Sequence, residues 1–182
     1  MRRRLILALV AAYSVSPHYW SADAVDPPDL AIGDFNSSGR GWRVLEEKGD
    51  FRGAAGMLEA YLLKHESALP EDETTLLHFH AAQEFAFSGD TSKALLQLPH
   101  ARFKVEPTDW PLAWNAYVDA TEAFLRRDLE TLKNARERIL AGPKVNGEPP
   151  NLFVVDSLID HFDESYYSAY TKARKPRSNQ AS

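Results

Sequence analysis

Apolar side chains recur with the spacing of an α-helix from about residue 40 onward. One stripe repeats at intervals of three and four residues and comprises Phe51, Ala54, Ala55, Leu58, Tyr61 and Leu62. A second stripe comprises Trp114, Tyr117, Val118, Thr121, Phe124 and Leu125. Each stripe marks one face of an amphipathic helix, and no stretch of the sequence alternates with the period of two that marks a β-strand. The pattern therefore predicts an all-α protein.

Short polar interruptions separate consecutive apolar stripes at a regular distance. They are Gly49-Asp50, Gly89-Asp90 and Arg127-Asp128. A glycine readily adopts the left-handed conformation that ends a helix, and the aspartate after it can accept hydrogen bonds from the free amides of the next helix. The three aspartates stand 40 and 38 residues apart, close to the length of one helical hairpin with its connector. The spacing predicts antiparallel hairpins that stack side by side.

Proline-containing segments separate the predicted hairpins, and they span residues 68–75, 104–111 and 141–150. Within the second segment, Thr108 and Asp109 are expected to cap the first helix of the third hairpin, with Pro111 in its first turn. After the third segment, Asn151 is expected to cap a further helix, and residues 165–170 to add a last turn or two. We expect this terminal pair of helices to cover the apolar end of the array.

The hairpin pattern resembles that of the tetratricopeptide (TPR) repeat family, in which small and aromatic residues occupy fixed packing positions. The second hairpin matches best, at Ala81, Ala82, Phe85, Ala94 and Leu98. The first hairpin matches in part, at Leu45, Ala54 and Leu58, and the third matches in part, at Ala120 and Phe124. The resemblance covers roughly residues 35–141. It departs from the family at His78, where the family has Trp, and in repeats longer than the usual length of about 34. The resemblance implies a short TPR-like α-solenoid of antiparallel hairpins with a C-terminal capping pair.

The same resemblance implies a concave groove that is lined by the first helix of each hairpin and binds a protein or peptide. The groove-facing positions of the family correspond to Arg43, Glu47, Phe79, Gln83, Phe87, Trp114 and Tyr117. For Trp114 and Tyr117 the favoured alternative is core packing, because both belong to a continuous apolar stripe.

The first residues have the features of an export signal. Three arginines precede a short apolar run from Leu5 to Val15, and a small-x-small site follows at Ala22-Asp23-Ala24. This combination predicts a signal peptide over residues 1–24, with a retained membrane anchor as the alternative. The sequence contains no cysteine, which excludes disulfides and an N-terminal lipid anchor on cysteine. We expect a periplasmic or secreted bacterial protein, without stable membrane insertion after signal cleavage.

Length and composition favour one domain after the signal peptide. The chain has 182 residues, of which 44% are hydrophobic, which is enough for a single core. We expect a flexible linker at 25–34, one helical domain at 35–170 and a disordered basic tail at 171–182. The net charge of -5 gives no general attraction for nucleic acid.

Signs of catalytic or metal chemistry are missing from the sequence. His78 and His80 are two positions apart and point in different directions on a helix, so they cannot bind one metal together. Residues 71–73 are acidic but precede an apolar helix, where negative charge is favourable. The motifs G-x-S-x-G and S-x-x-K and the phosphate-binding loop motif do not occur. We therefore expect no metal, no cofactor and no enzymatic activity.

The expected function is that of an adaptor or scaffold that binds a protein or peptide partner. Two alternatives stay open. One is a small hydrolase that acts on peptidoglycan through a site without a sequence motif, and the other is a structural protein that assembles with itself.

Overall fold

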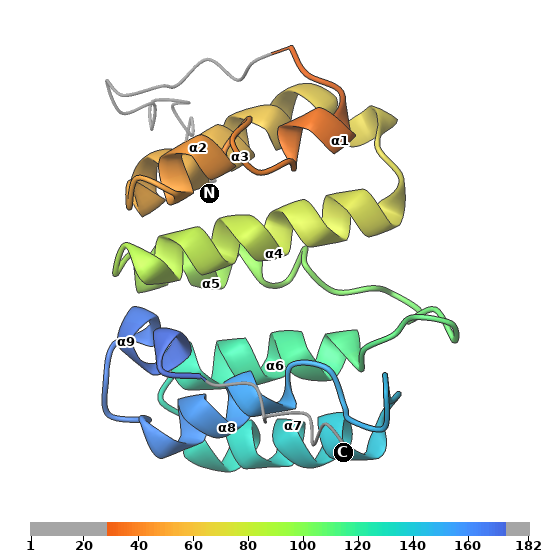
Figure 1. Ribbon diagram of the computed structural model, residues 1–182, viewed down its shortest axis with the longest axis vertical. Coiled ribbons are helices and arrows are strands. Elements are labelled where there is room, and N and C mark those ends of the chain that lie inside the picture. Colours follow the sequence, from red (N-terminus) through yellow and green to blue (C-terminus); the bar gives the residue numbers. More distant parts are fainter. Residues whose placement is uncertain (1–28, 174–182) are drawn as a thin grey trace, which may run out of the picture.

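The computed structural model describes residues 29–173, and over that range the chain is all-helical (Figure 1). Its helices are α1 (Ile32–Phe35), α2 (Arg43–Glu46), α3 (Phe51–His65), α4 (Glu71–Phe87), α5 (Thr91–Gln97), α6 (Trp114–Leu125), α7 (Leu129–Ala141), α8 (Leu152–Asp160) and α9 (Tyr166–Thr171), with a 3-10 turn, η1, at Glu66–Ala68. β pairing within these residues is limited to one isolated bridge, between Val145 and Glu148. The prediction of an all-α fold is confirmed.

Helices that follow one another along the chain pack as pairs. α3 packs against α4, α4 against α5, and α6 against α7. Figure 1 shows three successive layers, made by α1–α3, by α4 and α5, and by α6–α8. The short turns inside the hairpins lie at one edge of these layers, here called the turn edge. The connectors 66–70, 98–113 and 142–151 lie at the opposite edge, here called the connector edge.

The three predicted turns share one backbone geometry. The residue before each aspartate is left-handed, with φ of 77° at Gly49, 82° at Gly89 and 59° at Arg127. Each aspartate amide donates to the carbonyl five residues earlier, at Leu45 (2.9 Å), Phe85 (2.8 Å) and Ala123 (2.9 Å). Each aspartate carboxylate accepts from the amide of the third residue of the next helix, at Gly53, Lys93 and Thr131. The turn therefore ends one helix and caps the next, as predicted for Asp50, Asp90 and Asp128.

Arg127 takes the left-handed position that glycine holds in the other two turns. A residue with a Cβ is strained there, but the Arg127 side chain makes contacts that glycine cannot make. Its guanidinium lies 5.0 Å from the centroid of the Phe124 ring and donates to the carbonyls of Phe162 and Glu164. These contacts hold the segment that leads into α9.

The N-terminal core extends the ordered chain beyond the predicted domain boundary. Phe35 stacks on Tyr61 of α3, with ring centroids 3.8 Å apart. The Tyr61 hydroxyl donates to the carbonyl of Leu30 at 3.0 Å, and Leu30 and Ile32 pack against the same cluster. The described part of the predicted linker, residues 29–34, thus packs on α3.

The predicted start of the third hairpin is wrong by several residues. α6 begins at Trp114, and Thr108 and Asp109 lie in the connector before it. The carboxylate of Glu106 accepts from the amides of Trp114 (2.5 Å) and Asn115 (3.3 Å). Because this cap comes from the preceding loop, the local capping pattern could not reveal it.

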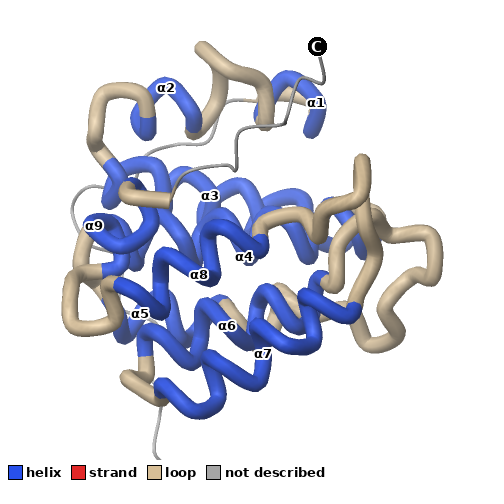
Figure 2. The backbone as a smooth tube through the Cα atoms, turned by 60° about the horizontal axis from the view of Figure 1, so that its bottom comes forward, coloured by secondary structure: helices blue, strands red, loops and turns tan. Residues whose placement is uncertain are grey.

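The C-terminal helices pack on different layers of the structure. α8 packs against α6 and α7, whereas α9 packs against α4 and α8. Figures 1 and 2 both place α9 at the turn edge. Asn151 does not cap α8 with its side chain as predicted, but takes a left-handed conformation with φ of 61°. Ser165, in contrast, caps α9 by accepting from the Ser168 amide.

Some predictions fall outside the described residues. The expected signal peptide, 1–24, lies entirely there, as do residues 25–28 and residues 174–182 of the expected tail. Of that tail, Thr171 is the last residue of α9, and Lys172 forms an ion pair with Glu164. In the portion from 29 to 173, no helix has both the length and the apolar character needed to cross a bilayer.

Candidate functional site

Arg43 and Glu47, the predicted groove residues of the first hairpin, are tied to the loop before α2. The Arg43 guanidinium donates to the Asn36 carbonyl (2.9 Å) and to Glu46 (3.0 Å). The Glu47 carboxylate accepts from the Ser38 hydroxyl (2.7 Å) and the Gly39 amide (3.0 Å). These two hydrogen bonds lower the pKa of Glu47, and the bond from Ser38 has the larger effect. Both side chains therefore have structural partners within the chain.

Phe79, Trp114 and Tyr117 lie in the core between α4 and α6. All three are buried, and the Phe79 ring is 5.1 Å from that of Trp114 and 5.3 Å from that of Tyr117. The Trp114 indole nitrogen donates to the Ala101 carbonyl at 2.7 Å. In the structure these residues join two layers, which agrees with the alternative that Trp114 and Tyr117 are packing residues.

Phe87, predicted to face the groove, lies beneath α9. Its ring is half-buried and lies 5.5, 5.6 and 5.1 Å from the rings of Tyr166, Tyr167 and Tyr170. Tyr166 also packs against Phe124 of α6, with ring centroids 5.7 Å apart. A short aromatic helix of the same chain thus covers this part of the predicted groove.

We call the surface under α9 the α9-binding face, and it comprises Gln83, Glu84, Phe87, Tyr117 and Phe124. Its polar members lie near the Tyr166 hydroxyl. Burial and the neighbouring Tyr170 raise the pKa of Tyr166, and Thr121 and Gln83 oppose that rise. Neither side chain reaches it with hydrogen-bond geometry, so the buried hydroxyl has no partner.

Glu84 is the residue of this face that the sequence analysis did not single out. Its side chain is fully buried, and neither carboxylate oxygen has a hydrogen-bond partner. Burial, together with the nearby Glu46, raises the pKa of Glu84 to about 8, and Arg43 opposes this rise. An isolated buried carboxylate is costly, so the group takes up a proton instead. The signal in the sequence was a single acidic residue inside the apolar run AAQEFAF.

His78 and His80 point to opposite sides of α4, as predicted. His78 faces α5 and η1, with its Nδ1 atom 2.7 Å from Gln97 and its Nε2 atom 3.4 Å from Glu66. The His80 ring packs against Trp42, with centroids 5.0 Å apart. Its Nδ1 atom has no partner, and burial lowers the pKa of His80 to about 4.

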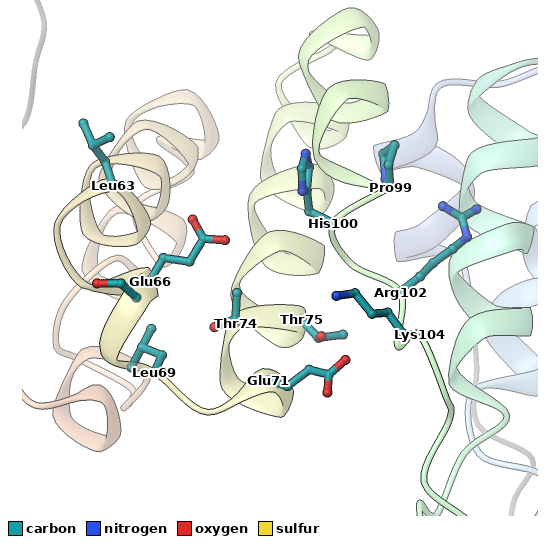
Figure 3. Close-up of a pocket in the computed structure, with 11 residues that line it drawn as sticks. Leu63, Glu66, Leu69, Glu71, Thr74, Thr75, Pro99, His100, Arg102 and Lys104 are labelled. Carbon is teal, nitrogen blue, oxygen red and sulfur yellow. The ribbon is translucent and has the colours of Figure 1, made fainter.

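A cleft of about 830 Å³ at the connector edge is a second candidate site (Figure 3). Glu66 and Glu71 supply its acidic groups from around the first connector, and His100 and Lys104 supply basic groups from the second. Because these charges oppose one another, the cleft has no preference for anionic or cationic ligands. None of the predicted groove residues lines it.

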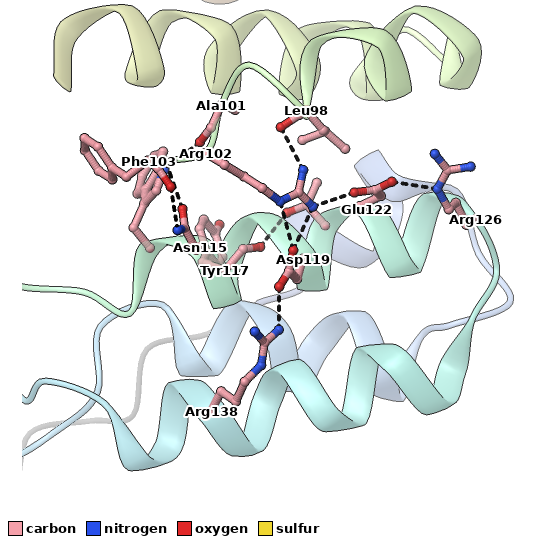
Figure 4. A network of polar contacts seen from close by, with 12 residues as sticks. Leu98, Ala101, Arg102, Phe103, Asn115, Tyr117, Asp119, Glu122, Arg126 and Arg138 are labelled. Carbon is pink, nitrogen blue, oxygen red and sulfur yellow. Dashed lines mark hydrogen bonds and ion pairs between the residues drawn. The ribbon is translucent and has the colours of Figure 1, made fainter. Parts of the chain in front are cut away.

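Arg102, which also lines the cleft, is already engaged in a structural network (Figure 4). Its guanidinium donates to the Leu98 carbonyl (3.0 Å), to Asp119 (3.0 and 2.7 Å) and to Glu122 (2.5 Å). Arg138 of α7 donates to the second oxygen of Asp119 at 2.6 Å. This network fixes the long connector to α6 and α7. The α9-binding face therefore remains the stronger candidate site.

Comparisons with protein-family models, with curated proteins and with solved structures find no match to this chain. Over residues 29–173, no three His, Asp or Glu side chains are grouped so that they could hold a metal ion.

Proposed function

We propose that this protein is a peptide- or protein-binding adaptor, built as a short TPR-like array and exported to a bacterial envelope or secreted. Its binding surface is the α9-binding face. The observation that carries the proposal is the position of α9, a six-residue helix that lies on this face with three tyrosines around Phe87.

The α9-binding face has the physical character of a peptide-docking surface. Short helices dock by laying a few apolar side chains into a groove, and buried aromatic side chains supply most of the affinity at such surfaces. Phe87 and Phe124 provide an apolar floor, and Gln83 adds a polar group. Because α9 belongs to the same chain, it occupies the face at high effective concentration. A partner would therefore replace α9 or bind when α9 undocks.

A pull-down from an extract of the source organism tests the proposal. The bait is the full chain as wild type, as the double variant Gln83→Arg plus Phe87→Glu, and as Leu96→Glu. Leu96 is 70% exposed on α5, so its variant is a control for added charge elsewhere. We expect the wild type and the control to recover the same partner and the double variant to lose it. Equal recovery by a double variant that still melts cooperatively would remove the α9-binding face from consideration.

A further inference from the structure

The buried carboxyl of Glu84 has no hydrogen-bond partner, and it stands one helical turn before Phe87, the α4 residue that α9 packs on. The Phe87 ring meets three tyrosine rings of α9, with centroids 5.1 to 5.6 Å away. Two polar groups of this region, the Glu84 carboxyl and the Tyr166 hydroxyl, are buried without hydrogen-bond partners. α9 therefore matches the apolar part of the face but leaves the buried Glu84 carboxyl, which takes up a proton there, without a partner.

Among the described residues, no cation is bonded to Glu84. Arg43 of α2 lowers the Glu84 pKa, but its guanidinium is bonded to Glu46 and to the Asn36 carbonyl. Glu46 itself adds negative charge next to Glu84. Other titratable groups with shifted pKa values on this face are His80 on α4, Tyr117 on α6 and Tyr166 on α9. Burial lowers the pKa of His80 and raises those of Tyr117 and Tyr166, so these three groups supply no charge to pair with Glu84.

Burying an ionised carboxylate costs less when a cation is buried beside it with good hydrogen-bond geometry. The place for such a cation is the position of Tyr166. Glu84 stands one helical turn before Phe87 on α4, and the Tyr166 ring lies 5.5 Å from the Phe87 ring, with its buried hydroxyl unpartnered. A side chain that ends in an ammonium or guanidinium group is long enough to carry its charge across a helix-helix contact.

We propose that the α9-binding face selects a helical peptide that combines aromatic side chains with one lysine or arginine, and that Glu84 is the specificity-determining residue that pairs with this cation. The proposal rests on the proposed function, since it names the partner chemistry of the same face. α9 then occupies the face in the absence of the ligand. It has the aromatic side chains of the ligand but not its cation.

Two synthetic peptides provide the test. Both carry residues 164–172 of the chain, ESYYSAYTK, one with Tyr166→Lys and the other with Tyr166→Met, which is similar in length and uncharged. The receptor is the full chain with Ser165→Ala, which lacks the N-cap of α9 and so weakens the internal competitor. The second receptor adds Glu84→Gln, which keeps the shape of the side chain and removes its charge. Thermal melts establish that both receptors are folded, and calorimetric titration gives the affinities.

We expect the Lys peptide to bind at least about tenfold more tightly than the Met peptide at pH 8.5, and Glu84→Gln to remove the difference. The affinity for the Lys peptide should also rise with pH from 6 to 8.5, because the pair needs Glu84 ionised, and this rise should be absent in the Gln variant. If both peptides bind equally well to the Glu84 receptor, the face binds peptides but Glu84 does not select the cation, which overturns this inference alone. If neither peptide binds, the proposed function is overturned with it.

Discussion

Two of the buried polar side chains on α4, His78 and Glu84, have different surroundings. His78 lies in a connected network: it bonds to Gln97 at 2.7 Å, Gln97 donates to Glu59 at 2.8 Å, and the His78 ring stacks on His100. Glu84 lies closer to the turn edge and has no bonded partner at all. A satisfied buried network is what a stable fold requires, whereas a buried group without partners lowers stability.

The His78 network joins α3, α4 and α5 and needs no further partner to explain it. The unpaired Glu84 lowers the stability of the isolated chain, and under the proposed function a partner that brings a cation to this position offsets that cost.

The largest effect should be the pH dependence that Glu84 gives to stability. Its pKa is about 8 in the folded chain, against an ordinary value of 4.5, so the folded state binds the proton more tightly than the unfolded state. The contribution of Glu84 to the free energy of unfolding is then fully present below pH 4.5. It is lost as pH rises to 8 and beyond, and the loss amounts to about 5 kcal/mol at most. Denaturant midpoints from pH 5 to 9 measure it. Glu84→Gln should flatten the curve, and an unchanged slope in this variant would exclude Glu84 as its source.

Phe87→Ala should loosen α9 while leaving the hairpins intact. Half-burial of this ring against three tyrosines makes a cost of about 2 to 3 kcal/mol reasonable for its removal. Hydrogen exchange should accelerate most at the amides of α9. The matched control is Leu96→Ala on exposed α5, which should change stability by less than about 0.5 kcal/mol. Uniform acceleration over all helices would show that Phe87 supports the whole fold instead of α9.

His78→Leu should lower stability at pH 7, whereas Glu84→Leu should not. Removing His78 leaves the side-chain oxygen of Gln97 without its partner and should lower the free energy of unfolding by about 1 to 2 kcal/mol. Replacing the unpaired Glu84 by an apolar residue should leave stability unchanged or raise it. Chemical denaturation of both variants measures the difference. The same sign and size for both would remove the distinction between the two sites.

The smallest effect concerns the turn edge, where capping should be local and equal at each turn. Asp90→Ala should lower the free energy of unfolding by about 1 kcal/mol, because the Lys93 amide loses its acceptor. Asp72→Ala, in the first turn of α4, should cost only a few tenths through the helix dipole. Thermal melts at moderate salt compare the two variants. A larger cost for Asp72→Ala than for Asp90→Ala would contradict the role of Asp90 as a cap.

The turn edge could be predicted from the sequence because its signals are local. Gly49-Asp50 and Gly89-Asp90 act on residues within one turn of themselves, and the structure confirms both. Even Arg127-Asp128, which lacks the glycine, keeps the same turn. The connector edge could not be predicted in the same way, because Asn115 bonds to both backbone groups of Phe103 and Glu106 caps α6 from eight residues away.

The candidate site was predicted only in part. Gln83 and Phe87 were assigned to the groove by resemblance, and they lie on the face that α9 covers. The position of α9 depends on contacts such as Phe87 with Tyr170, which join residues far apart in the sequence and leave no periodic pattern. Glu84 was missed because a single acidic residue in an apolar run shows neither its burial nor its lack of partners.

Hydrogen exchange in α9 during peptide binding tests the central claim most directly. The full wild-type chain is mixed with an excess of the Tyr166→Lys form of peptide 164–172, and the exchange of the Ala169 amide, which donates to the Ser165 carbonyl at 3.0 Å, is followed. If the peptide and α9 compete for one face, exchange in α9 should accelerate as the peptide saturates, while α4 and α6 stay protected. A peptide that binds and leaves α9 fully protected would contradict the account.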